Sequence, residues 1–114
     1  LARINKNSVN NELQFVYIGS GTTELVTIGS QSSTDWMHLA ITVSASADQF
    51  KAYIGGAQVG ATQTTLGAWV GTLVANETYV GADAAALIWN GYLAHCCVLN
   101  RAATADEMRQ AAAI

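Results

Sequence analysis

The chain has 114 residues, enough for one domain with a single hydrophobic core, and 51% of them are apolar. Charged residues make up only 11% and the formal net charge is −3, which argues against an electrostatic interface with nucleic acid or with an anionic membrane. No apolar run approaches the roughly 18 residues that a membrane-spanning helix needs, so we expect no membrane insertion.

Short apolar runs bounded by Gly, Ser, Asn or Asp predict a chain made mostly of β-strands. Gly19-Ser-Gly21 ends the first run and predicts a hairpin, and Gly55-Gly56 predicts a second tight turn because glycine adopts positive φ angles. Residues 66–74 are less regular and predict a loop with a short strand. The expected strands cover residues 13–18, 24–28, 36–43, 50–54, 57–59, 78–80 and 92–99.

The segment Trp36–Val43 is the clearest of these strands. Side chains alternate between the two faces of a strand, so one face carries Met37, Leu39, Ile41 and Val43 and the other carries Trp36, His38, Ala40 and Thr42. We expect Trp36 and at least one other tryptophan to fill the core.

One helix is predicted near the end of the chain, over residues 105–113. Thr104-Ala-Asp-Glu107 has the form of a capping box, in which Thr104 and Glu107 each satisfy a free backbone donor. Asp106 and Glu107 also suit the positive end of the helix dipole. The pattern as a whole predicts an all-β domain with one short C-terminal helix.

Four stretches resemble the laminin-G-like module of the concanavalin A-like lectin and glucanase superfamily. They are Trp36-Met-His-Leu-Ala-Ile-Thr-Val43, Phe50-Lys-Ala-Tyr-Ile-Gly-Gly56, Tyr79-Val-Gly-Ala-Asp83 and Trp89-Asn-Gly-Tyr-Leu-Ala-His-Cys-Cys-Val-Leu-Asn-Arg-Ala-Ala-Thr-Ala-Asp-Glu107. The last aligns without a gap to that family's closing pattern, although Ala94 and His95 replace its acidic pair and Gly55 replaces an Asn or Asp. The resemblance covers residues 12–110 and implies an antiparallel β-sandwich, a jelly roll.

A complete module of this family also carries additional N-terminal strands that are not visible in the sequence. The chain starts at Leu1 rather than at a methionine. We therefore expect residues 1–114 to be a single, N-terminally incomplete domain, with the missing strands in an unseen segment or supplied by a partner chain.

Glycoside hydrolases also occur in this superfamily, and they need two carboxylates that flank the scissile bond. The acidic residues of the chain are Glu12, Glu24, Asp35, Asp48, Glu77, Asp83, Asp106 and Glu107. Only the last two are adjacent, and they cap a helix. We therefore expect the protein not to be an enzyme.

Cys96 and Cys97 are adjacent and on a strand would point to opposite faces, so neither a mutual disulfide nor a zinc site suits them. Relatives hold Ca²⁺ at the rim of the sandwich, and the resemblance makes Asp83 the candidate ligand. A second carboxylate would come from Asp35 or Asp48. The alternative for Asp83 is a turn-forming role.

The resemblance also assigns the two faces of residues 92–99. Cys96 and Val98 take the family's apolar positions, and His95 and Cys97 take its charged ones. We expect Cys96 to be buried, Cys97 to be more accessible, and Leu99 to be covered by the tail helix or a neighbour.

Glycan binding needs exposed aromatic faces beside amide or hydroxyl side chains. Trp69, Trp89 and Tyr92 are the candidate stacking residues, and Asn90 is the candidate polar contact. Further amides and hydroxyls are available at residues 63–65.

The sequence therefore predicts a non-catalytic recognition module, glycan-binding or adhesive, of a surface or virion protein. Its location would be extracellular or on a virion surface, and its partner a glycan, a protein surface or other chains of a larger assembly. The alternative is a purely structural component of a viral, phage-like particle, such as a capsid decoration or tail protein. Low charge, abundant Ala, Thr and Gly, and the lack of a disulfide framework favour a particle over an animal extracellular matrix.

Overall fold

The computed structural model describes residues 1–7, 9–72, 78–83 and 87–113, and the side chains of residues 83, 87 and 88 also lie outside the described part. Most of the described elements are strands, and the larger ones form two antiparallel sheets. Within these ranges no helix is long and apolar enough to cross a membrane. The all-β class with one short C-terminal helix is confirmed.

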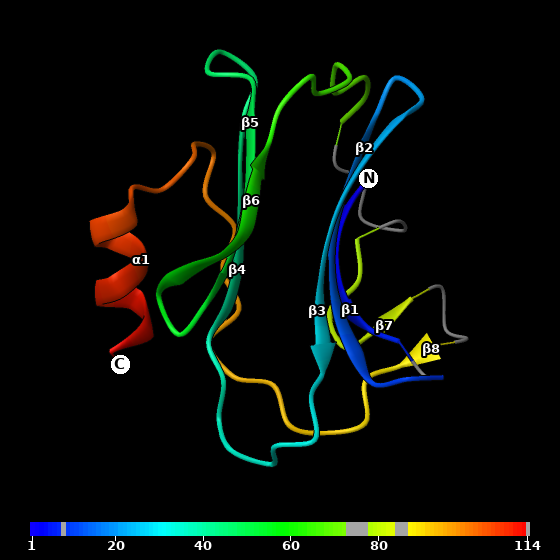
Figure 1. Ribbon diagram of the computed structural model, residues 1–114, viewed down its shortest axis with the longest axis vertical. Helices are drawn as coiled ribbons and strands as arrows, with labels where there is room; N and C mark the ends of the chain where they lie inside the picture. The colour runs from blue at the N-terminus through cyan, green and yellow to red at the C-terminus, as the bar shows by residue number, and fades with distance from the viewer. Residues whose placement is uncertain (8, 73–77, 84–86, 114) are drawn as a thin grey trace.

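Each sheet has three strands in sequence order, so each is a simple meander. The first sheet consists of β1 (Ala2–Lys6), β2 (Glu12–Gly19) and β3 (Thr22–Ser30). The second consists of β4 (Leu39–Ser44), β5 (Gln49–Ile54) and β6 (Ala57–Gln63). Figure 1 shows the two sheets facing each other as a sandwich, with α1 (Ala105–Ala112) on the outer side of the second sheet.

Both predicted hairpin turns are confirmed, because left-handed residues occupy each of them. Ser20 and Gly21 join β2 to β3 with φ angles of 44° and 80°, and Gly55 and Gly56 join β5 to β6 with φ angles of 59° and 81°. Two consecutive residues with positive φ give the turn whose twist matches that of antiparallel strands.

The hydrophobic core lies between the two sheets. Its buried members are Leu13, Phe15, Tyr17, Val26, Phe50 and Ala52. The predicted apolar face of the 36–43 segment packs against this cluster, and so does Trp89. Phe15 and Phe50 are both 0% exposed, so the centre of the sandwich is closed to the surrounding solvent.

Trp36 does not fill the core, so the prediction that it is buried there is wrong. Its side chain is 75% exposed. β4 begins only at Leu39, which pairs with Ile54, the last residue of β5. Since the chain turns at Gly55, none of the described strands lies opposite the residues that precede Leu39. Trp89 supplies the additional core tryptophan that the sequence analysis expected.

Three short strands differ from the predicted ones. β1 was not predicted, although it pairs with β2 along its whole length and its Ile4 packs against the core. β7 (Ala82–Asp83) and β8 (Leu87–Ile88) pair with each other, whereas the expected strand at residues 78–80 is absent.

Residues 92–99 form no strand, so this prediction is wrong. The segment pairs with none of the described strands, and His95 has a left-handed φ of 55° that interrupts any extended run. Without a neighbouring sheet its side chains are open to solvent. Cys96 and Cys97 are both exposed, and Leu99 is 55% exposed. The expected burial of Cys96 and of Leu99 is therefore wrong.

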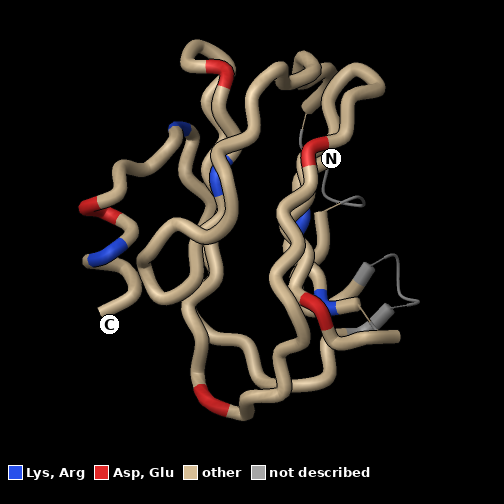
Figure 2. The backbone as a smooth tube through the Cα atoms, viewed as in Figure 1, with Lys and Arg blue, Asp and Glu red and all other residues tan. Residues whose placement is uncertain are grey.

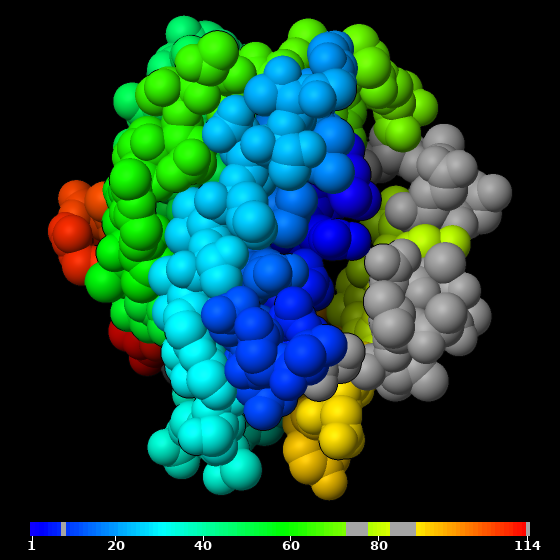
Figure 3. Space-filling model, turned by 45° about the vertical axis from the view of Figure 1, so that its right-hand side comes forward, coloured from blue at the N-terminus to red at the C-terminus, as the bar shows by residue number. Residues whose placement is uncertain are grey.

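One side of the sandwich is closed by β3 and β6, which lie side by side (Figure 3). Gly60 of β6 has a φ of 68°, and a Cβ atom there would lie 2.6 Å from Cγ1 of Val26. The absence of a side chain at Gly60 therefore allows the two sheets to approach each other at this edge.

Candidate functional site

The loop that follows β6 is tied to the end of β2. The Tyr17 hydroxyl donates a hydrogen bond of 2.8 Å to the Gly67 carbonyl, and the Ser20 hydroxyl donates one of 3.1 Å to the Ala68 carbonyl. Gly19 and Gly67 are in close backbone contact, since a Cβ atom on Gly67 would overlap the Gly19 carbonyl. Two glycines and two hydroxyls therefore fix the course of this loop.

Asp48 holds the beginning of the same loop. Its Oδ2 accepts a hydrogen bond of 2.8 Å from the Thr65 amide, and its Oδ1 accepts one of 2.8 Å from the Leu66 amide. These two backbone hydrogen bonds lower the pKa of the Asp48 carboxyl below its usual value. Leu66 packs against the core. Asp48, a candidate second calcium ligand in the sequence analysis, thus anchors a loop in the structure.

This loop presents Trp69 at the surface. The Trp69 ring lies against the Tyr17 ring, with centroids 6.0 Å apart and planes inclined by 31°. Tyr17 in turn contacts Phe50, at 6.3 Å between ring centroids, so the indole is backed by the core. Trp69 is still 43% exposed. An aromatic surface is therefore held firmly and remains available to a ligand.

Trp69 lines a cleft of about 460 Å³, here called the Trp69 cleft. Tyr79 contributes a second aromatic side chain, which is 48% exposed. Hydroxyl groups come from Ser20 and Thr72, and further lining residues include Leu1, Ile18, Val70 and Thr78. Tyr79 was not among the predicted site residues, because the sequence placed it only in an expected strand at residues 78–80.

The other predicted glycan contacts lie elsewhere. Trp89 is partly buried against the core, and its amide donates a 2.8 Å hydrogen bond to the Gly81 carbonyl. Asn90 is exposed, and Tyr92 is 89% exposed. None of the three lines the Trp69 cleft. The structure therefore separates Trp69 from the other candidates.

The candidate calcium ligand Asp83 belongs to β7, and its side chain lies outside the described part of the structure. Among the described residues, no three His, Cys, Asp or Glu side chains come together as a metal site. Asp35 is exposed in the connection between the two sheets, where its amide donates to the Ser33 hydroxyl at 3.1 Å.

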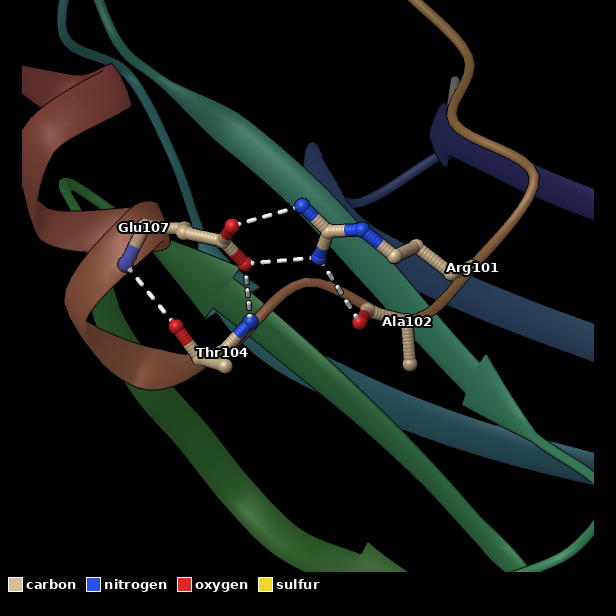
Figure 4. Close-up of polar contacts among 4 residues, drawn as sticks. All are labelled: Arg101, Ala102, Thr104 and Glu107. Carbon is tan, nitrogen blue, oxygen red and sulfur yellow. Dashed lines mark hydrogen bonds and ion pairs between the residues drawn. The ribbon is translucent and has the colours of Figure 1, made fainter.

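The segment that leads into α1 is held by a local network (Figure 4). Arg101 donates two hydrogen bonds to the Glu107 carboxylate, of 2.9 and 2.6 Å. The predicted capping box is confirmed: the Thr104 amide donates to Glu107 Oε2 at 2.8 Å, and the Glu107 amide donates to Thr104 Oγ1 at 3.2 Å. Hydrogen bonds from the Arg101 guanidinium and the Thr104 amide lower the pKa of Glu107 to about 2.

The helix then lies against the β5–β6 turn. Met108 is its buried residue, at 8% exposed. A Cβ atom on Gly56 would lie 2.8 Å from the Arg109 Cα and 3.0 Å from the Met108 carbonyl oxygen. The closing Asn-Arg-Ala-Ala-Thr-Ala-Asp-Glu107 motif thus builds a capped helix, and Gly56 provides the surface on which it packs.

A laminin G family model, described as the concanavalin A-like lectin/glucanases superfamily, matches residues 3–109. The chain belongs to this superfamily. Among solved structures, it is similar to residues 221–444 of an S-layer domain-containing protein from Clostridium thermocellum ATCC 27405, with 25% identity and a TM-score of 0.46. The match covers 97% of this chain and 55% of that one, so the chain spans about half its length. No curated protein matches the chain.

The superfamily includes glucanases as well as lectins, and hydrolysis of a glycosidic bond needs two neighbouring carboxyl groups. Figure 2 shows acidic and basic residues scattered over turns, strands and the helix rather than gathered in one place. Glu107 is bound by Arg101, and Asp106 forms an ion pair with Arg109. Glu12 is the first residue of β2, and Glu24 of β3 pairs with Tyr17, five residues further along β2. The backbone positions of the two glutamates are therefore roughly 17 Å apart along the strand direction. Their backbone positions are therefore further apart than the carboxyl groups of a glycosidase pair, which lie about 5–9.5 Å from each other.

Proposed function

We propose that this member of the concanavalin A-like superfamily is a non-catalytic recognition module that binds a neutral glycan in the Trp69 cleft. The observation that carries the proposal is the exposed indole of Trp69, backed by the buried Tyr17 ring and bordered by hydroxyl groups. The C–H groups of a sugar ring pack against an aromatic face, and its hydroxyl groups form hydrogen bonds with polar neighbours. A cleft with an exposed indole and hydroxyl groups can make both kinds of contact.

The cleft favours a neutral ligand. Its described lining contains aromatic, aliphatic and hydroxyl side chains but no Asp, Glu, Lys or Arg, and the ammonium group of Leu1 donates a 2.8 Å hydrogen bond to the Ile18 carbonyl. A charged sugar would lose solvation there without gaining a described side chain of opposite charge. The cleft volume of about 460 Å³ suits one or two sugar rings.

The loop that carries Trp69 is also formed in advance of binding. Hydrogen bonds from Tyr17 and Ser20, and two more to Asp48, hold its backbone through contacts within the protein. A preformed loop loses little conformational freedom on binding, so more of the contact energy contributes to affinity. This arrangement supports recognition of a ligand of defined shape.

We further propose that the module acts at a cell surface or outside the cell, where a glycan ligand would be displayed. Asp83 remains the proposed calcium ligand, and calcium would then bind at the rim of the sandwich. Adhesion to a glycan-coated partner is the corresponding biological role.

A glycan array, screened with calcium and with a chelator, tests the proposal and identifies a neutral oligosaccharide for calorimetry. Trp69→Ala should weaken binding of that oligosaccharide at least about tenfold, as expected for a central aromatic contact. Tyr92→Ala is the matched control, because Tyr92 is an exposed aromatic residue outside the cleft. Unchanged binding by Trp69→Ala would refute the site, and release of reducing sugar from the bound oligosaccharide would refute the non-catalytic role.

A further inference from the structure

A second cavity, of about 310 Å³, lies on the outer face of the β4–β5–β6 sheet beside the start of α1. Strand alternation brings Thr42, Lys51 and Tyr53 to this face, since the residues between them point into the core. Thr42 lies directly opposite Lys51 in the β4–β5 pair. Residues 102–105 and Arg109 form the other wall. This space is here called the outer cavity.

Two hydroxyl groups open onto the outer cavity and have no partner in the described protein. Tyr53 is 3% exposed and Thr42 is 7% exposed. Both line the cavity, and neither side chain makes a hydrogen bond to any described residue. Neither hydroxyl oxygen is sealed inside the protein, so both can form hydrogen bonds to a polar ligand that enters the cavity.

Lys51 adds one uncompensated positive charge. It is half-buried, and within the described residues no carboxylate lies within ion-pair distance of it. The second cation of the wall, Arg109, already forms an ion pair with Asp106. No described carboxylate neutralises the Lys51 ammonium group, so it is available to an anion in the cavity.

We propose that the outer cavity binds a monosaccharide that carries a single carboxylate, of the hexuronate class. Lys51 donates to the carboxylate, and the hydroxyls of Tyr53 and Thr42 bond to the hydroxyl groups of the sugar. One available cation matches a monoanion, whereas a phosphate dianion would retain an unmatched charge. The volume lies at the lower end of the usual range for small-ligand sites, which fits one sugar ring.

This site is separate from the Trp69 cleft. The two share no lining residue, and they differ in charge, since the Trp69 cleft has no Lys or Arg in its described lining. Residues of β4, β5 and α1 line the outer cavity. Figure 1 shows α1 on the outer side of the second sheet, away from the first sheet. Loss of binding at one site should therefore leave the other unchanged.

Calorimetric titration with sodium D-glucuronate tests the proposal, with D-glucose and sodium phosphate as comparison probes. We expect glucuronate to bind in the millimolar range and the other two at least about tenfold more weakly. Lys51→Met should lower glucuronate affinity at least about tenfold, because a charge-assisted hydrogen bond is lost. Tyr53→Phe should lower it about threefold or more, because one neutral hydrogen bond is lost while the ring stays. Lys6→Met, an exposed lysine of β1, is the control and should bind as the wild type.

Each other outcome has a defined meaning. Absence of glucuronate binding by the wild type, or full affinity in both Lys51→Met and Tyr53→Phe, overturns the site. Equal affinity for phosphate and glucuronate indicates a general anion site and overturns the sugar assignment. Trp69→Ala should retain glucuronate binding, and its loss there would place the ligand in the Trp69 cleft instead. Thermal unfolding of each variant verifies that it is folded.

Discussion

Two buried tyrosines on the central strands differ in one respect that a pair of substitutions can isolate. Tyr17 of β2 and Tyr53 of β5 are 2% and 3% exposed. The Tyr17 hydroxyl donates a 2.8 Å hydrogen bond to the Gly67 carbonyl, whereas the Tyr53 hydroxyl has no partner among the described residues. Replacement by phenylalanine removes the same oxygen atom from each and leaves the ring in place.

Tyr17→Phe should lower the free energy of unfolding by about 1 kcal/mol, the usual contribution of one such hydrogen bond. An unfolding entropy of about 2.1 cal/mol/K per residue, taken over 114 residues, converts this loss into a fall in Tm of about 4 °C. Tyr53→Phe should change the free energy by less than about 0.5 kcal/mol, because no hydrogen bond within the protein is lost.

Urea unfolding followed by tryptophan fluorescence measures both variants against the wild type. Equal destabilisation by the two substitutions would show that the hydrogen bond to Gly67 contributes nothing. Tyr17→Phe should also weaken binding of the neutral oligosaccharide, because it releases the loop that holds Trp69, whereas Tyr53→Phe should not. A Tyr17→Phe protein with full stability and full affinity would refute the view that this contact fixes the loop.

Three further predictions concern the helix cap, the loop contact and the thiols. The folded pKa of Glu107, about 2, lies below its ordinary value of 4.5, so its contribution to stability is complete above about pH 4.5 and is lost as the pH falls toward 2. Glu107→Gln should flatten that part of a pH series of urea unfolding curves, and an unaltered series would contradict the assignment. Gly67→Ala should destabilise the protein by more than about 2 kcal/mol, because its methyl group would overlap a backbone carbonyl of β2. Gly29→Ala, where a Cβ meets nothing within 4 Å, is the control and should cost less than about 1 kcal/mol by thermal unfolding. Cys96 and Cys97 should both react with a thiol reagent in the native protein, and protection of either one would contradict their exposure.

The features that the sequence predicted correctly are mostly local. The turn at Gly55 and Gly56 depends on the φ angles of two residues, and the capping box depends on Thr104 and Glu107, three positions apart. Such features arise from neighbouring residues, so their sequence signals are sufficient. The apolar face around Leu39 was also predictable, because alternation within one strand defines it.

The failures concern burial that depends on distant partners. Trp36 and Cys96 were expected in the core, but each would need a paired strand opposite it, and none of the strands that the structure describes lies there. Trp69 was a candidate, yet its cleft with Tyr79 depends on a backbone contact of Gly67 with a distant strand. The outer cavity was invisible for a similar reason, since it forms only where the helix docks on the sheet.

The meander order of both sheets has a consequence for how the protein folds. One sheet is built entirely from residues 2–30 and the other from residues 39–63, and the connection between them contains no strand. Strands that follow one another in the chain close short loops, so each sheet can assemble quickly and independently of the other. Association of two preformed halves is then the late step. Cleavage of the chain within residues 31–38 should therefore leave two fragments that reassemble into the same sandwich when they are mixed.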